Sequence, residues 1–130
     1  MQLVRIYQCL CDRTRLRILN LLRDDPLCVC HLQAILREPQ VKISKHLRYL
    51  KARGMVESRK AGNWRIYRLP ARRPPGLAAN LRCLQDCAAE DATFRADAAK
   101  LKRLRGRLAG ETPLCAPRRA SHRVPSSCAC

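Results

Sequence analysis

The spacing of apolar residues changes once along the first 70 residues, and this change restricts the fold more than any other feature. Up to Gly54, apolar side chains recur at intervals of about three and four residues, which is the period of amphipathic helices. Beyond Gly54, two short runs at 55–59 and 64–69 contain β-branched or aromatic residues and flank a break at 60–63, which predicts a β-hairpin. The predicted fold is therefore mainly α with a small β-hairpin.

Residues that start or stop helices bound the predicted elements. Asp12 can cap the N-terminus of a helix over 13–24, and Pro26 follows its end. A turn at 38–40 separates a short helix over 29–37 from a helix over 41–53, and Gly54 is suited to a left-handed C-cap. These two helices predict a helix-turn-helix, and the hairpin makes it winged. A first helix is expected over 1–10.

Helical spacing returns at Gly76 and continues to about Leu108, so we expect one long terminal helix. Such a helix extends beyond what a small domain can cover alone. We therefore expect a homodimer formed through the terminal helices. Residues 1–110 are predicted to form one domain. Residues 111–130, which contain Pro and Ser, are predicted to form a flexible tail that carries three cysteines, Cys115, Cys128 and Cys130.

The net charge of +17, from 27 Lys and Arg against 10 Asp and Glu, favours binding to a polyanion. The charge is concentrated, because residues 37–73 hold twelve Lys or Arg and two Glu. No apolar stretch approaches the ~18 residues that a membrane helix needs, and the N-terminus does not resemble a signal peptide. We expect a cytoplasmic protein with no membrane partner, in which thiols are reduced.

The predicted helix over 41–53 buries Ile43, Leu47 and Leu50 and turns its basic residues outward. The N-terminal part of such a helix meets base edges in the major groove, so Lys42 and Lys45 are the candidates for base contacts. Other basic residues, including Lys51 and Arg68, are expected to touch phosphates. A solvated charged face, or a structural or RNA-binding basic protein, is the alternative. The predicted double-stranded DNA contacts are Gln40, Lys42, Ser44, Lys45, His46, Arg48, Tyr49, Arg59, Lys60 and Arg65.

Two thiols, Cys28 and Cys30, lie at the start of the predicted helix-turn-helix. Thiolates select soft metal and metalloid ions, so this pair is the candidate effector site. Residues two apart on an ideal helix point about 200° apart, so both sulfurs can bind one ion only if the helix start is frayed or unwinds. We expect the bound effector to distort this first turn. The alternatives are two thiols that only pack at a helix start, and a redox switch.

Four segments of the chain resemble the ArsR/SmtB metalloregulators: Asp12–Leu19, Leu27–Leu32, Ile43–Leu47 and Arg53–Val56, followed by the hairpin Arg59–Leu69. The Leu-Cys-Val-Cys segment is similar to the arsenic-sensing and cadmium/lead-sensing branches. The resemblance covers roughly residues 5–110. It implies a homodimeric repressor that binds an inverted-repeat operator and leaves it when an effector binds the cysteines.

The arsenic branch implies As(III) or Sb(III) as the effector. The zinc branch uses His on the last helix, and residues 76–108 contain no His. The cadmium/lead branch adds thiols from an N-terminal arm, which we do not find before Met1. A Cd/Pb-responsive or thiol redox-responsive repressor of the same fold stays open. An enzyme is not expected, because no redox C-x-x-C, phosphate-binding glycine loop or cluster of potential bases is present.

The resemblance leaves the third thiol ligand open. The arsenic branch often has a third Cys three residues after the second, and Gln33 stands at that place here. The candidates for the third sulfur are Cys9, Cys11, Cys83, Cys87, Cys115, Cys128 and Cys130.

Overall fold

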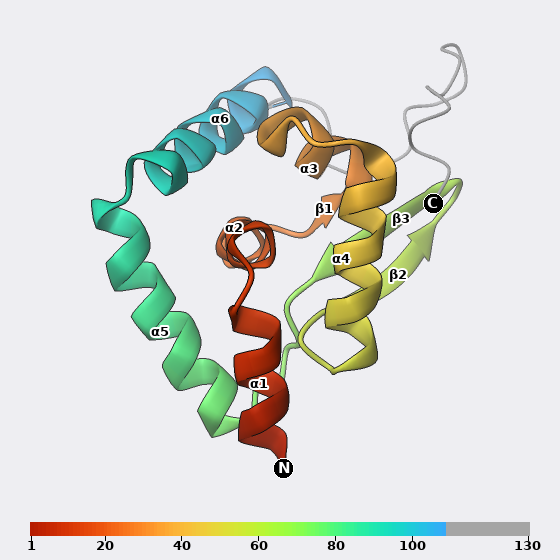
Figure 1. Ribbon diagram of the computed structural model, residues 1–130. Helices are drawn as coiled ribbons and strands as arrows, with labels where there is room; N and C mark the ends of the chain where they lie inside the picture. The colour runs from red at the N-terminus through yellow and green to blue at the C-terminus, as the bar shows by residue number, and fades with distance from the viewer. Residues whose placement is uncertain (109–130) are drawn as a thin grey trace.

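The computed structural model describes residues 1–108, which form a helical domain with a small antiparallel sheet (Figure 1). The predicted tail over 111–130, with its three cysteines, lies outside the described residues. The elements in chain order are α1 (Gln2–Leu10), α2 (Arg13–Leu22), β1 (Leu27–Cys28), α3 (Val29–Leu36), α4 (Gln40–Ala52), β2 (Glu57–Ala61), β3 (Trp64–Arg68), α5 (Pro75–Glu90) and α6 (Ala92–Leu108).

Helix α2 is the centre of the domain, and the other helices surround it (Figure 1). Asp12 caps its N-terminus as predicted, because the carboxylate accepts a 3.0 Å hydrogen bond from the Arg15 backbone N–H. Ile18, Leu19 and Leu21 are almost fully buried. Burying each such side chain stabilises the fold by roughly 1.5–3 kcal/mol. The same apolar core continues into α3, α4, α5 and α6.

The helix-turn-helix prediction is confirmed. Helix α3 ends at Arg37, which has a left-handed backbone (φ 53°), and α4 begins directly after Pro39. Ile43, Leu47 and Leu50 are buried, as the spacing predicts. Gly54 has φ 74° and lets the chain leave α4 for the hairpin.

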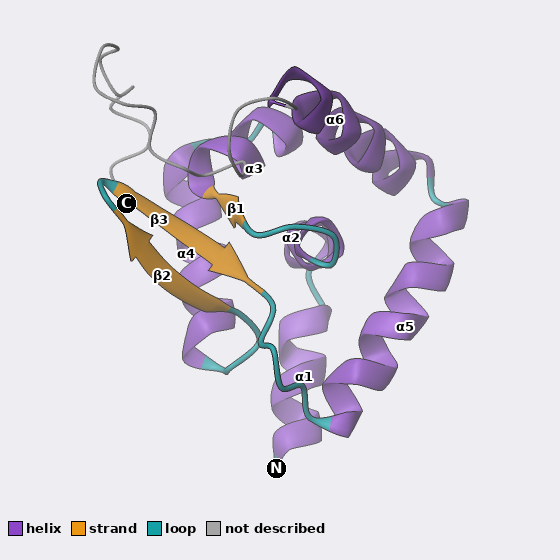
Figure 2. Ribbon diagram, turned by 180° about the vertical axis from the view of Figure 1, so that it is seen from behind, coloured by secondary structure: helices purple, strands orange, loops and turns teal. Residues whose placement is uncertain are grey.

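The hairpin is also confirmed, and a third strand joins it (Figure 2). Strands β2 and β3 pair antiparallel across a two-residue turn in which Gly62 has φ 62°. The two residues of β1 pair with β3 on its other edge, with Leu27 opposite Tyr67 and Cys28 opposite Ile66. Strand β1 is not among the predicted elements, because a two-residue strand has no periodicity of its own.

The predicted single helix over 76–108 is wrong. Asp91 is extended (φ −91°, ψ 127°) and separates α5 from α6. Its carboxylate accepts hydrogen bonds from the backbone N–H groups of Thr93 (2.8 Å) and Phe94 (3.2 Å), and so caps α6. Helix α6 therefore turns back and packs on α2 and α3 (Figure 1). Its apolar face, with Phe94 and Leu101, is buried within its own protomer, so the length of the helix no longer argues for a dimer.

An ion pair fastens α6 to the central helix. The Arg17 guanidinium donates two hydrogen bonds to the Asp97 carboxylate, from Nε at 2.7 Å and from Nη2 at 2.8 Å. The Asp97 side chain is 1% exposed. The hydrogen bond to Asp97 raises the pKa of Arg17.

None of the helices within residues 1–108 combines the length and the hydropathy that a membrane-spanning helix needs.

Candidate thiol site and nucleic-acid interface

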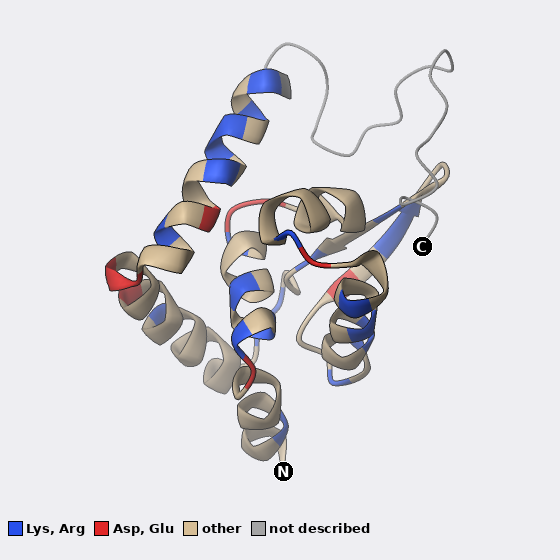
Figure 3. Cartoon of the chain, turned by 45° about the horizontal axis from the view of Figure 1, so that its top comes forward, with Lys and Arg blue, Asp and Glu red and all other residues tan. Residues whose placement is uncertain are grey.

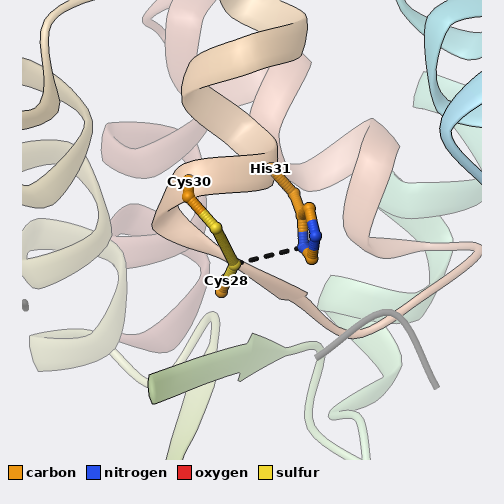
Figure 4. Close-up of a disulfide and its surroundings, with 3 residues drawn as sticks. All are labelled: Cys28, Cys30 and His31. Carbon is orange, nitrogen blue, oxygen red and sulfur yellow. Dashed lines mark hydrogen bonds between the residues drawn. A yellow bond between two sulfur atoms is a disulfide. The ribbon is translucent and has the colours of Figure 1, made fainter. Parts of the chain in front are cut away.

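Cys28 and Cys30 meet at the junction between β1 and α3 (Figure 4). Cys28 is the N-cap residue of α3 with an extended backbone (φ −87°, ψ 166°), whereas Cys30 lies in the first helical turn. The structure joins the two residues by a disulfide, with Cα atoms 5.5 Å apart. Of the two conditions expected for the sulfurs to meet, a frayed or an unwound helix start, the structure fits the first, because Cys28 is extended and stands outside α3.

His31 completes a group of three donor side chains and is not among the predicted site residues. Its Nδ1 lies 3.1 Å from the Cys28 sulfur, and the three potential ligand atoms lie within 4.8 Å of one another (Figure 4). Burial lowers the pKa of His31, which favours the neutral imidazole near pH 7. The available signal was that His31 directly follows Cys30.

None of the other described cysteines joins this group of donors. Cys9 is buried on α1, where burial raises the pKa of its thiol. Cys11 is exposed just after α1, and Cys83 and Cys87 are exposed on α5. Cys83 raises the pKa of Cys87, so these two thiols interact with each other. Cys115, Cys128 and Cys130 lie outside the described residues.

The thiol site packs directly against the hairpin. Cys28 and Ile66 are both buried and touch, and Cys30 and Trp64 are partly buried against them. Because Cys28 also pairs with β3 and Cys30 belongs to α3, the thiol pair lies in contact with both the hairpin and the helix-turn-helix.

The three donors fit a soft ion. Two sulfurs and one imidazole are ligands that thiophilic metals and metalloids accept, whereas Mg²⁺ or Ca²⁺ would require oxygen donors. Binding requires the reduced pair, because disulfide sulfurs have no thiolate charge to offer.

Cationic residues gather on the outer side of α4 and on the hairpin (Figure 3). Lys42, Lys45 and Arg48 are exposed on α4, whereas Gln40 and Ser44 are half-buried. Val41 is 81% exposed near the start of the helix. The Lys42 ammonium lies 3.1 Å from the Glu38 carboxylate, so it is partly neutralised within the protein. Lys45 and Arg48 form no ion pair within residues 1–108 and are the more available cations.

Two residues of α4 that were predicted to contact DNA lie closer to the protein interior. Tyr49 does not face fully outward, because it is half-buried against the core. The guanidinium of Arg53 lies 3.5 Å from the centre of its ring, and that of Arg15 lies 4.3 Å away. His46 is half-buried, and this burial lowers its pKa.

The hairpin presents most of its cations to solvent. Arg59 and Lys60 are exposed on β2, and Lys51 is exposed near the end of α4. Arg65 is half-buried and donates a 3.2 Å hydrogen bond to the Ser58 hydroxyl. Arg68 pairs with Glu57 across the strands at 3.2 Å.

Comparison with known proteins relates this geometry to a family. Residues 12–58 match the model of the bacterial regulatory protein arsR family. The chain is 34% identical to the arsenic resistance transcriptional regulator ArsR2 of Pseudomonas putida over 112 residues, which cover 85% of this chain and 95% of that protein. It is 41% identical to the arsenical resistance operon repressor of Escherichia coli over 76 residues, which cover 58% and 65% of the two chains.

A third relative is ArsR1 of Pseudomonas putida, also an arsenic resistance transcriptional regulator, at 39% identity over 62% of this chain and 64% of its own. The chain thus spans slightly less than two thirds of ArsR1 and of the Escherichia coli repressor. Among solved structures, HlyU from Vibrio cholerae superposes with a TM-score of 0.62 and 27% identity, covering 68% of this chain and 94% of HlyU. The chain belongs to the arsR family of winged helix-turn-helix transcriptional repressors, which are DNA-binding regulators and not enzymes.

Proposed function

We propose that this protein is an As(III)- or Sb(III)-responsive repressor that binds an inverted-repeat operator as a homodimer. In this proposal, the metalloid binds Cys28 and Cys30 and the protein then leaves the DNA. The observation that carries the proposal is the meeting of two sulfurs and an imidazole at the first residues of the helix-turn-helix. The relatives named for arsenic resistance support the choice of effector.

The chemistry is an exchange of oxygen for sulfur on the metalloid. Arsenous acid, As(OH)₃, reacts with two thiols to give a dithiolate that keeps one hydroxyl, and two water molecules leave. No electrons are transferred. The His31 Nδ1, 3.1 Å from the Cys28 sulfur, can accept the proton of that thiol while the As–S bond forms. A soft divalent ion would instead use this nitrogen as a third ligand.

The site can signal to DNA without unwinding a helix. A metalloid would hold the two reduced sulfurs at a fixed separation, and Cys28 cannot move without disturbing its pairing with Ile66. Cys30 would move α3 against α4, since these two helices pack together. A coupling of about 1–3 kcal/mol would lower the DNA affinity about 5- to 150-fold.

The test is operator release from the reduced protein, titrated with As(III), Sb(III), Cd(II), Pb(II) and Zn(II). We expect release by As(III) and Sb(III), and no such release from Cys28→Ser and Cys30→Ser. Cys83→Ser is the matched control, because Cys83 is exposed on α5, outside the donor group. Trp64, the only tryptophan, packs against the site, so its fluorescence should report binding without DNA. Release of the double serine variant at the parental arsenite dose would contradict the proposal.

The disulfide between Cys28 and Cys30 favours a second candidate, a thiol redox-responsive repressor. Peroxide would oxidise the two thiols to the disulfide and be reduced to two molecules of water. Titrating the reduced protein with peroxide in the absence of arsenite separates the candidates. DNA release by peroxide that a phosphine reductant reverses would favour this second function, and release by arsenite alone would exclude it.

A further inference from the structure

A hollow lies between α3 and α6, away from the thiol site, with a volume of about 350 Å³. Ala34, Ile35 and Leu104 form the apolar part of its lining. Four cationic side chains line it, and they come from two separate parts of the chain: Arg37, Lys100, Arg103 and Arg107.

Among the described residues, three of these four cations have no acidic partner. No Asp or Glu lines the hollow, and over residues 1–108 no ion pair involves Arg37, Arg103 or Arg107. Lys100 donates a 3.3 Å hydrogen bond to the Ile35 carbonyl, which holds its ammonium at the rim. By contrast, Arg105 on the same helix pairs with Asp25. Four like charges around one hollow repel one another, and an anion that enters the hollow offsets this repulsion.

The position of the hollow relates it to the DNA-reading helix. Arg37 ends α3, and α4 begins at Gln40. Arg37 thus connects the lining of the hollow, through a turn of two residues, to the N-terminal end of α4, which is the end that meets base edges in a helix-turn-helix. The view in Figure 1 shows α3 between α6 and this end of α4. Figure 3 shows cationic residues continuing along α6.

We propose that this hollow is a phosphate-binding site, which takes a phosphodiester of the operator backbone next to the groove that α4 enters. The inference rests on the proposed DNA binding and adds α6 to the DNA-binding surface. Three guanidinium groups and one ammonium match the oxygen atoms of a phosphate, because guanidinium groups donate two parallel hydrogen bonds to it.

The test compares two double variants of α6 that remove the same charge. The hollow variant, Arg103→Gln/Arg107→Gln, removes two of the cations that line the hollow. The control, Arg95→Gln/Lys102→Gln, removes two exposed cations that do not line it. Operator affinity is measured against salt concentration for each. We expect the slope of log K against log salt to fall by about 0.9 for each phosphate that the hollow variant no longer neutralises, and by clearly less in the control. Equal slopes in the two variants overturn the operator phosphate as the ligand.

Inorganic phosphate distinguishes the two sources of the same chemistry. Calorimetric titration with phosphate at constant ionic strength is run on the wild type and on both variants without DNA. Phosphate binding by the wild type and by Arg95→Gln/Lys102→Gln, but not by Arg103→Gln/Arg107→Gln, supports a phosphate site. If the salt slopes of operator binding are at the same time equal in the two variants, the ligand is free phosphate and not the operator backbone. If neither a slope difference nor phosphate binding is observed, the proposal is overturned. If the wild type bound no operator, the proposed function would fail, and this titration would still decide the phosphate site.

Discussion

The backbone conformation of one residue decides where the two sulfurs of the thiol pair lie. Cys28 is extended and ends a strand, so its sulfur meets that of Cys30 even though the two residues are close neighbours in sequence. Had both been helical, their side chains would point about 200° apart. The same conformation places the His31 imidazole against the Cys28 sulfur. The donor group is therefore preformed.

His31→Gln should separate metalloids from divalent ions at this site. For As(III), we expect slower Trp64 quenching but a nearly unchanged endpoint, because the imidazole only accepts a proton. For Cd(II), we expect weaker binding, by about tenfold or more, since one ligand is removed (about 1.4 kcal/mol per tenfold). Stopped-flow fluorescence and equilibrium titration measure both. Equal effects on the two ions would contradict the assigned role.

Lys45→Ala should weaken operator binding and relax its sequence preference. Lys45 is exposed on α4 and forms no ion pair within residues 1–108, so it is the stronger candidate for a base contact than Lys42, which Glu38 neutralises. The expected loss of discrimination is about 1–3 kcal/mol at one base position. Lys60→Ala on the hairpin is the comparison, and it should weaken all sequences about equally. Competition binding with single-base operator variants measures this difference.

At the scale of elements, α6 is held in place by polar contacts that an apolar pattern does not show. Asp91 starts the helix and Asp97 fastens it to α2. Sequence spacing correctly predicted α2, α3, α4 and the hairpin, because their apolar periods and the glycines Gly54 and Gly62 are local signals. It failed at Asp91, since the helical spacing on both sides continues through the break.

Asp97→Asn should destabilise the domain strongly. The substitution keeps the size of the side chain but leaves the Arg17 guanidinium, 16% exposed, without its counter-charge. Breaking one partner of a buried pair costs on the order of 3 kcal/mol. Chemical denaturation measures the loss, and Asp86→Asn on the exposed side of α5 is the control. Replacing both partners by apolar residues, as in Arg17→Met/Asp97→Leu, should recover much of the stability. If both variants were equally unstable, the missing counter-charge would not be the cause.

Asp91 makes the stability of α6 depend on pH. Backbone N–H donors at Phe94 and Thr93 lower the pKa of Asp91, with a further contribution from Arg13. Because the folded-state pKa lies below the unfolded value, this stabilisation is complete above the ordinary carboxyl pKa of about 3.9. It disappears as the pH falls through the lower, folded-state pKa. Asp91→Asn should thus have a lower Tm than the wild type at neutral pH, and the difference should vanish in acid. A difference that persisted in acid would contradict this origin.

For the whole molecule, most of the large apolar side chains exposed within residues 1–108 lie on α1 or directly before it, beside α5, and Val41 on α4 is the other. Leu3, Val4 and Tyr7 on α1 are 37%, 50% and 54% exposed. Helix α1 packs beside the start of α5, where a Cβ on Gly76 would lie 3.2 Å from the Ile6 side chain. We expect the homodimer to form on the surface of α1 and α5, since the apolar face of α6 already packs within the protomer.

Val4→Glu should therefore yield a monomer at concentrations where the wild type sediments as a dimer. A buried, unpaired carboxylate opposes association. Operator affinity should fall with it, because two half-sites about 34–36 Å apart are read only by a dimer. Ala96→Glu on α6 adds the same charge at an exposed position and should leave the dimer intact. Dimerisation that survived in the first variant and failed in the second would place the interface on α6.

The sequence alone determined the elements whose signals are local: the helix-turn-helix, the hairpin, the concentration of positive charge and the pair of thiols. Only the tertiary structure decided where those thiols point, that His31 joins them, and that α6 turns back at Asp91 to form a basic hollow with α3. The physical reason is that periodicity records which side of an element is buried. Which side chains of β1, α3, β3 and α6 lie together depends on how these elements pack. A two-residue strand and a single capping carboxylate are too short to show any periodicity in the sequence.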